Sequence, residues 1–142
     1  MLPDTYDIVE AIAKLYSGRG AIVEIGAGFN PWIAYNIKKR IPFARVIIVD
    51  KDQRALDYIR SVCSDLEVRL DDVTKLKIDN YSGVEIVYSI RPPPELIPYV
   101  EILARRIGAL LLIRPLTEGE SGYTFDERKW MKIHPHLYVL KI

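Results

Sequence analysis

Apolar residues follow two spacings that alternate along the chain. Four segments carry apolar residues three or four positions apart, which predicts helices over Asp4 to Tyr16, Pro31 to Arg40, Asp52 to Val62 and Pro98 to Arg106. Continuous short apolar runs, typical of strands covered on both faces, predict strands over Gly20 to Ile25, Ala44 to Val49, Leu66 to Leu70, Val84 to Ile90 and Ile107 to Ile113. Strands that alternate with helices indicate βαβ units and therefore a parallel sheet.

The last part of the chain has a different pattern. Lys129 to Ile133 and His136 to Ile142 alternate weakly across His134-Pro135, which predicts an antiparallel hairpin. The whole pattern predicts an α/β fold, a Rossmann-like three-layer sandwich whose mostly parallel sheet has the central order 3-2-1-4-5. A chain of 142 residues can form one such domain over residues 1–142.

Composition excludes several classes of protein. The formal net charge of +1 gives no bulk-charge argument for nucleic-acid binding. Cys63 is the single cysteine, so an internal disulfide and a cysteine-rich metal cluster are excluded, and we expect no metal site. Because no apolar stretch has the length of a membrane span and no secretory signal is visible, we expect a cytoplasmic protein without membrane contact.

The first predicted strand ends in a glycine loop, "VEIGAGFNPW". In a parallel sheet, ligands bind at the carboxyl ends of the strands, so this loop is a candidate ligand site. Gly26 and Gly28 allow a tight turn and a close approach of the backbone to a ligand. A dinucleotide-binding loop would need a third glycine where Pro31 stands. Asn30-Pro31 is instead typical of a helix start, because asparagine caps free amide groups and proline suits the first helical position.

Glu24 lies two residues before the first glycine of the loop. A carboxylate at this place would repel a pyrophosphate and favour a ligand with positive charge, by roughly 1 kcal/mol or more if water is partly excluded. S-adenosylmethionine carries an amino group and a sulfonium and has no phosphate. Glu24 therefore favours this nucleoside over a dinucleotide.

The motif "VEIGAGFN" resembles the first motif of class I S-adenosylmethionine-dependent methyltransferases, and the whole pattern resembles a small uncharacterised archaeal family of methyltransferase-like Rossmann proteins. The resemblance implies that Asp50 binds the ribose hydroxyls, that Asp72 in "DDVTKL" contacts the adenine amino group, and that Ser89 lies beside the transferred methyl. The complete set of cofactor-binding residues implied for S-adenosylmethionine is Glu24, Gly26, Ala27, Gly28, Asn30, Asp50, Asp72 and Ser89.

Two features depart from the methyltransferase pattern. Asn30 stands where the third glycine of the motif would fall, although asparagine tolerates positive φ better than most residues. Leu116 to Thr124 contains two glycines and is predicted to be a loop, where the family has a helix, so the fold is predicted to be truncated. The exposed part of the sheet needs either a short substitute element or a partner subunit, and a homodimer is the expected form.

The fourth predicted strand runs into "SIRPPPELIPYV". Consecutive prolines predict an extended, rigid segment over Arg91 to Pro94. Methyltransferases that modify base amino groups have a hydrogen-bond acceptor at the position of Arg91, and arginine cannot accept. Arg91 suits an anion instead, and Arg114, which ends "LLLIR", should emerge beside it. These two arginines are the candidate catalytic residues; the alternative is that they form ion pairs with Glu95, Glu118 or Glu120.

The leading hypothesis is S-adenosylmethionine-dependent methyl transfer to an anionic small molecule or RNA. No residue identifies itself as a general base, since His134 and His136 flank a proline in a predicted exposed turn. One alternative is a non-catalytic protein that keeps the nucleotide pocket for binding or assembly. Another is a dinucleotide-binding protein, which Glu24 and Pro31 disfavour.

Overall fold

The computed structural model describes residues 2–116 and 123–141 and contains, within them, one sheet of seven strands. The strands are β1 (Ala21–Ile25), β2 (Val46–Asp50), β3 (Glu67–Leu70), β4 (Val84–Ile90), β5 (Leu110–Arg114), β6 (Trp130–His134) and β7 (Leu137–Leu140). Their order in the sheet is β3-β2-β1-β4-β5-β7-β6. The first five strands are parallel, while β7 runs antiparallel to both β5 and β6. The predicted central order and the carboxyl-terminal antiparallel hairpin are confirmed.

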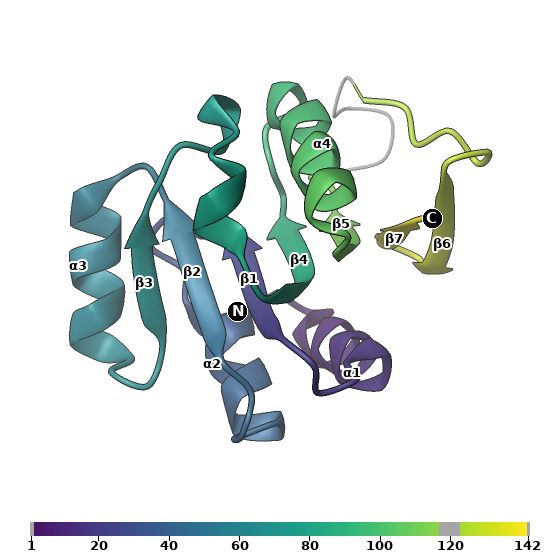
Figure 1. The fold of residues 1–142 in the computed structure, drawn as a ribbon. Coiled ribbons are helices and arrows are strands. Elements are labelled where there is room, and N and C mark those ends of the chain that lie inside the picture. Colours follow the sequence, from purple (N-terminus) through teal and green to yellow (C-terminus); the bar gives the residue numbers. More distant parts are fainter. Residues whose placement is uncertain (1, 117–122, 142) are drawn as a thin grey trace.

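Helices cover both faces of this sheet (Figure 1). The helices are α1 (Thr5–Leu15), α2 (Trp32–Arg40), α3 (Gln53–Val62) and α4 (Ile97–Ile107). The first three pack on one face, and α4 packs on the other together with two 3₁₀ turns, η1 (Val73–Lys75) and η2 (Ile78–Tyr81). In β1, Ile22 faces the α1–α3 layer and Val23 faces α4, and both are fully buried. Burial on both faces explains why this strand is apolar at every position except Glu24.

The start of β5 and the connection between β3 and β4 differ from the sequence prediction for local reasons. The strand predicted from Ile107 begins only at Leu110, because Ile107 is the last residue of α4 and Gly108, at φ 71°, closes that helix. A left-handed glycine is the commonest way to end a helix. Between β3 and β4 the chain forms η1 and η2 in place of a full helix, and no element had been predicted there.

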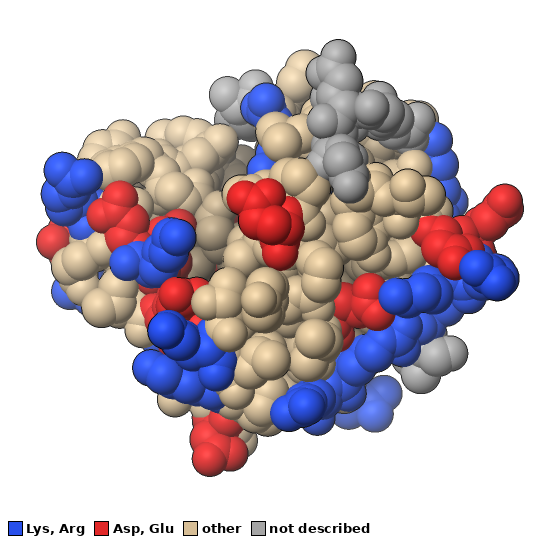
Figure 2. Space-filling model, turned by 90° about the horizontal axis from the view of Figure 1, so that it is seen from above, with Lys and Arg blue, Asp and Glu red and all other residues tan. Residues whose placement is uncertain are grey.

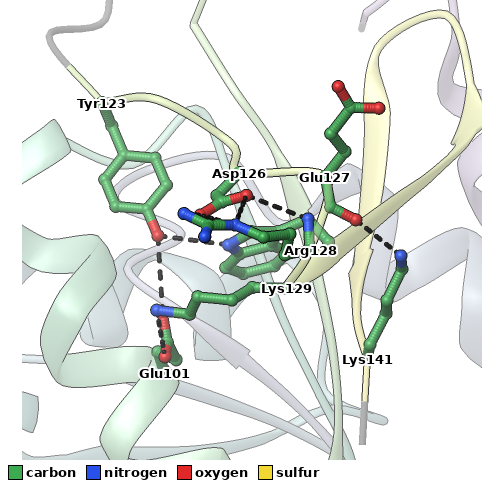
Figure 3. Close-up of polar contacts among 8 residues, drawn as sticks. Glu101, Tyr123, Asp126, Glu127, Arg128, Lys129 and Lys141 are labelled. Carbon is green, nitrogen blue, oxygen red and sulfur yellow. Dashed lines mark hydrogen bonds and ion pairs between the residues drawn. The ribbon is translucent and has the colours of Figure 1, made fainter.

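A short aromatic segment covers the end of the sheet where the family pattern has a helix. Phe125 stacks on Tyr138 with ring centroids 4.1 Å apart, and Trp130 meets Phe125 edge-on at 5.1 Å. Figure 3 shows how Glu101 of α4 anchors this segment: its carboxylate pairs with Lys129 Nζ at 2.9 Å and accepts a hydrogen bond from the Tyr123 hydroxyl at 3.4 Å.

These contacts supply the first of the two predicted solutions, a short substitute element, at residues 123–130. Most of the predicted loop, residues 117–122, lies outside the described residues. The expected homodimer stays a prediction. Among the described residues, no helix has the length and apolarity needed to cross a membrane.

Candidate functional site

A cavity of about 510 Å³ opens at the carboxyl ends of β1, β2 and β3, beside the start of α4. Its lining residues are Ile25, Gly26, Gly28, Val49, Asp50, Lys51, Asp71, Asp72, Val73, Thr74, Pro93, Glu95, Leu96 and Tyr99. Figure 2 looks down on this edge of the sheet and shows acidic side chains near the middle of the face. The volume is in the range of small-molecule sites and sufficient for a nucleoside.

The glycine loop uses its own amide groups internally. Gly26 lies at φ 78°, and its N–H donates to the carbonyl oxygen of Val49 at 2.8 Å. Gly28 lies at φ 60°, and its N–H donates to Asp50 Oδ2 at 2.9 Å. Rossmann loops that bind pyrophosphate direct such amides at the ligand. Since both glycine amides are occupied by this chain, neither of these two amides is available to a phosphate.

The start of α2 differs by one residue from the prediction, because Pro31 is the N-cap and Trp32 is the first helical residue, although Asn30 does bind a free amide there. Asn30 Oδ1 accepts a hydrogen bond from the Trp32 amide at 3.2 Å, and the Asn30 amide donates to the carbonyl of Ala27 at 3.1 Å. These contacts join the end of the glycine loop to the start of α2. Neither Ala27 nor Asn30 lines the cavity.

Asp50 ends β2 and lies at the cavity, as predicted. Its carboxylate accepts the Gly28 amide at Oδ2 and the Asp52 amide at Oδ1, each at 2.9 Å. A carboxylate oxygen has two acceptor sites, so each oxygen can still accept a hydroxyl. The two amides hold the carboxylate in one orientation.

Two neighbouring carboxylates follow β3. Asp72 accepts the Thr74 hydroxyl at 2.6 Å and the Thr74 amide at 3.0 Å, and these hydrogen bonds lower the pKa of its carboxyl. Asp71, which was not in the predicted cofactor-binding set, has a side chain only 1% exposed. Its Oδ2 accepts the Tyr81 hydroxyl at 2.7 Å, while Oδ1 has no hydrogen-bond partner among the described residues and lies 3.9 Å from Lys77 Nζ.

The cavity lining is strongly acidic. It contains Asp50, Asp72 and Glu95, which are at least partly exposed, against the single ammonium of Lys51. The fourth acidic residue of the lining, Asp71, has a buried side chain. Such a concentration of negative charge repels phosphates and favours ligands with amino or hydroxyl donors or positive charge. Glu95 could not be predicted as a cavity residue from the sequence alone, because Glu95 lies on the 3₁₀ turn Pro94–Leu96 before α4 and does not directly follow a strand.

Glu24 lies on the opposite side of the sheet, facing the α1–α3 layer with Tyr88, and does not line the cavity. It is 2% exposed, and its Oε1 accepts the Tyr88 hydroxyl at 2.7 Å. Burial, opposed by the Tyr88 hydrogen bond and reinforced by the charge of Asp50, raises the pKa of Glu24 to about 8. The acidic residues at the cavity are therefore Asp50, Asp72 and Glu95, and the predicted place of Glu24 beside the ligand is not found.

Ser89 is buried between two strand ends. Its hydroxyl donates to the carbonyl of Ile25 at 2.7 Å, which ties the end of β4 to the end of β1. Ser89 does not line the cavity either. Of the eight predicted cofactor-binding residues, the structure therefore brings Gly26, Gly28, Asp50 and Asp72 together around one space.

Arg91 and Arg114 are neighbours in the backbone but have different environments. The Arg91 amide donates to the carbonyl of Arg114 at 2.5 Å. Arg91 is exposed and lies at φ 53°, so the prediction that it is extended is wrong; Pro93, at φ −56° and ψ 140°, does have the predicted polyproline geometry. Arg114 Nε instead pairs with Asp4 Oδ2 at 3.0 Å, and Nη1 donates to the carbonyl of Pro115 at 2.7 Å.

Arg114 is therefore paired within the chain, and Arg91 is the one of the two predicted anion-binding arginines that is exposed. The acidic partner of Arg114 is Asp4, a residue outside the expected set of Glu95, Glu118 and Glu120, of which the last two lie outside the described residues. His134 also contacts an acidic residue, since its Nε2 lies 3.0 Å from Oδ2 of Asp7 on α1. His136 is exposed in the turn before β7.

Solved structures with the same fold are methyltransferases and other Rossmann-like proteins. An amino pentose methyltransferase from Micromonospora echinaspora with bound SAM superposes with a TM-score of 0.62 at 14% identity, covering 83% of this chain and 52% of that one. The fibrillarin/Nop5p complex gives 0.59 at 11% identity over 88% and 72% of the two chains. A protein described as a zinc-dependent alcohol dehydrogenase from Rhodobacter sphaeroides gives 0.62 at 17% identity over 79% and 46%. The fold is methyltransferase-like. The fold alone does not identify the ligand, so the ligand has to be inferred from the residues of the site.

The chain belongs to the UPF0146 family, described as an uncharacterised protein family, whose model matches residues 5–142. A UPF0146 protein of Methanocaldococcus jannaschii is 33% identical over 111 residues, which cover 77% of each chain. A relative from Archaeoglobus fulgidus is 35% identical over 111 residues, 77% of this chain and 76% of that one. The predicted resemblance to a small archaeal family with a methyltransferase-like fold is confirmed.

Proposed function

We propose that the protein binds S-adenosylmethionine and transfers its methyl group to an anionic small molecule or RNA. One observation carries this proposal: a nucleoside-sized cavity at the glycine loop is lined by three at least partly exposed acidic residues, Asp50, Asp72 and Glu95, while both glycine amides are already bound within the chain. This combination disfavours a pyrophosphate and favours a phosphate-free, positively charged nucleoside.

The residues at the cavity fit this ligand group by group. Asp50, oriented by two amides, suits the ribose hydroxyls, and Asp72 suits an exocyclic amine donor. The apolar side chains of Ile25, Val73 and Leu96 provide the surface on which a planar base packs.

When bound, S-adenosylmethionine supplies an electrophilic methyl group on a sulfonium. The protein's contribution is to hold the acceptor in line and to exclude water, which does not require a catalytic triad. Arg91 is exposed at the carboxyl end of β4, in a backbone conformation that costs about 1–3 kcal/mol in a non-glycine residue. Such strain is typical of functional positions, and we assign Arg91 to the anionic group of the acceptor.

A second candidate function is nucleoside binding without methyl transfer. It is favoured by Arg114, whose ion pair with Asp4 removes one of the two expected anion-binding groups. It shares the cavity with the first candidate and differs in having no acceptor.

Calorimetry with S-adenosylmethionine, S-adenosylhomocysteine and NAD tests the ligand. We expect both sulfur nucleosides to bind with a Kd well below about 1 mM, and NAD to bind at least tenfold more weakly. Asp50→Asn should weaken nucleoside binding about tenfold, since a hydrogen bond to a charged group is lost. Glu127→Gln, which removes an exposed carboxylate on the aromatic segment (Figure 3), should change nothing.

Preference for NAD, or no heat with any nucleoside at that concentration, would overturn the assignment of the cavity. Transfer of a radiolabelled methyl group into fractionated small molecules and RNA then separates the enzyme from the binding protein. Label incorporation that depends on Arg91 supports methyl transfer, and nucleoside binding without incorporation supports the second candidate.

A further inference from the structure

Exposed aromatic side chains concentrate in one layer of the molecule. The described residues that are aromatic and at least 37% exposed are Tyr6, Phe29, Trp32, Tyr35, Phe43, Tyr58 and Tyr99. Six of these seven lie in or beside the α1–α3 layer; Tyr99 alone belongs to α4. Solvent-exposed rings gathered on one face indicate an interaction surface.

Two hollows flank α2 on this face. The first, of about 490 Å³, lies between α2 and the end of α3 and includes Tyr35, Val62 and Cys63 in its lining. The second, of about 330 Å³, lies between α1 and α2 and includes Tyr6 and Asn36. Each hollow is large enough for a planar ring of nucleobase size and presents an exposed tyrosine.

Lys39 lines both hollows and therefore lies on the ridge between them. Its ammonium is 5.4 Å from the centroid of the Tyr35 ring. The neighbouring Lys38 donates to the carbonyls of Pro42 and Ala44 at 2.9 and 2.7 Å, which orient the ammonium without neutralising its charge. Cations at the end of α2 also complement the helix dipole, but the dipole does not account for the exposed rings beside them.

We propose that this surface, formed by Tyr35, Lys38, Lys39 and the two hollows, binds single-stranded nucleic acid. One base occupies each hollow, stacked on Tyr35 or Tyr6, and the phosphate between the bases meets Lys39. Alternating rings and cations are the chemistry of single-strand recognition, because every base has a face for stacking and every linkage a negative charge. The surface lies on the α1–α3 layer, so this binding does not depend on the nucleoside cavity.

A second copy of the chain fits the same surface less well. In a two-fold dimer the same patch faces itself, which would bring Lys38 and Lys39 of both copies together. The two hollows are also lined by Asp65 and by Glu10, and Glu10 pairs with Arg40 at 3.0 Å. Lys38 and Lys39 leave the surface with an excess of positive charge that a polyanion complements, and we therefore assign the surface to nucleic acid.

Fluorescence anisotropy with labelled strands of about ten nucleotides tests the assignment, using RNA and DNA of one mixed sequence and the DNA duplex, without S-adenosylmethionine. We expect micromolar binding of single strands, roughly tenfold tighter than the duplex, that weakens between about 50 and 200 mM salt. The ratio of RNA to DNA affinity identifies which strand is preferred. Tyr35→Ala should weaken binding by about 5- to 100-fold, the cost of losing one stacked base.

Matched variants separate stacking and charge from general damage. Tyr35→Phe keeps the ring and should bind as the wild type does. Lys39→Gln should weaken binding and lower the slope of log affinity against log salt concentration by about 0.7. Arg106→Gln makes the same charge change at an exposed position of α4 and should have neither effect. Circular dichroism and nucleoside binding should be unchanged in all four variants.

No binding at low salt, equal loss with Arg106→Gln, or unchanged affinity of Tyr35→Ala would each overturn the proposal. Sedimentation of the free protein provides the remaining comparison. A dimer that Tyr35→Ala dissociates would assign the surface to self-association and overturn the nucleic-acid assignment.

Discussion

Two neighbouring strand ends carry the same tripeptide, Ile-Arg-Pro, and the structure treats them differently. At the end of β5, Arg114 is still in the strand, 12% exposed at its side chain, and paired with Asp4 at the start of α1. At the end of β4, Arg91 has left the strand at φ 53° and is exposed. The identical local sequence leads to a structural ion pair in one place and a strained, solvent-facing cation in the other, so the surroundings decide the role of each arginine.

The contacts that hold the two strand ends in place also differ in charge. The end of β5 is held to α1 by two opposite charges that are nearly buried. The end of β4 is held to β1 by the Tyr88 hydroxyl on Glu24 and the Ser89 hydroxyl on a carbonyl. The first fastening needs an ionised carboxylate, and the second lies in surroundings that favour a protonated one, because burial raises the pKa of Glu24.

The largest effect is expected at Glu24 as the pH changes. Its folded-state pKa of about 8 lies above the ordinary value of 4.5, so its contribution to stability is fully present below pH 4.5 and is lost as the pH rises towards 8. The loss is on the order of 5 kcal/mol. Glu24→Gln should remove this decline and be more stable than the wild type at pH 8, as measured by urea unfolding at each pH.

The control for this measurement is Glu127→Gln, which changes an exposed carboxylate and should keep the wild-type pH dependence. If Glu24→Gln loses stability with rising pH as steeply as the wild type does, Glu24 is ionised in the folded protein and the contrast between the two strand ends disappears.

The next effect compares the two arginines directly. Arg114→Ala leaves the carboxylate of Asp4 nearly buried and unpaired, and should lower the free energy of unfolding by about 3 kcal/mol. Arg91→Ala removes an exposed side chain and should change stability by less than about 0.5 kcal/mol. Equal losses in urea unfolding would show that both arginines are structural and would remove Arg91 from the proposed site.

The sequence predicts most of the architecture because the signals for it are local. Continuous apolar runs mark the parallel strands, and Asn30 binds the first amide of α2, although Pro31 and not Asn30 is the N-cap. Asp50 and Asp72 reach the cavity because each directly follows a strand. The sheet order also agrees, since short connections leave few ways to arrange such units.

The environment of a side chain could not be predicted in the same way. Asp4 and Arg114 are 110 positions apart, and no local pattern pairs them. A strand buried on both faces shows no polar alternation, so the sequence does not reveal that Glu24 faces away from the cavity. The left-handed backbone of Arg91 is likewise unexpected before a proline, which favours extended conformations in the preceding residue.

The smallest effect tests that strain. Glycine adopts positive φ without a steric penalty, so Arg91→Gly should raise the free energy of unfolding by about 1 kcal/mol, whereas Arg114→Gly should lower it because the ion pair with Asp4 is lost. Arg91→Ala keeps the strain while removing the charge, and therefore separates the two contributions. If Arg91→Gly is more stable than the wild type but no longer supports methyl incorporation, the Arg91 side chain is needed for function at a cost in stability. If Arg91→Gly is no more stable than Arg91→Ala, the backbone there stores no strain, and the argument from strain to function fails.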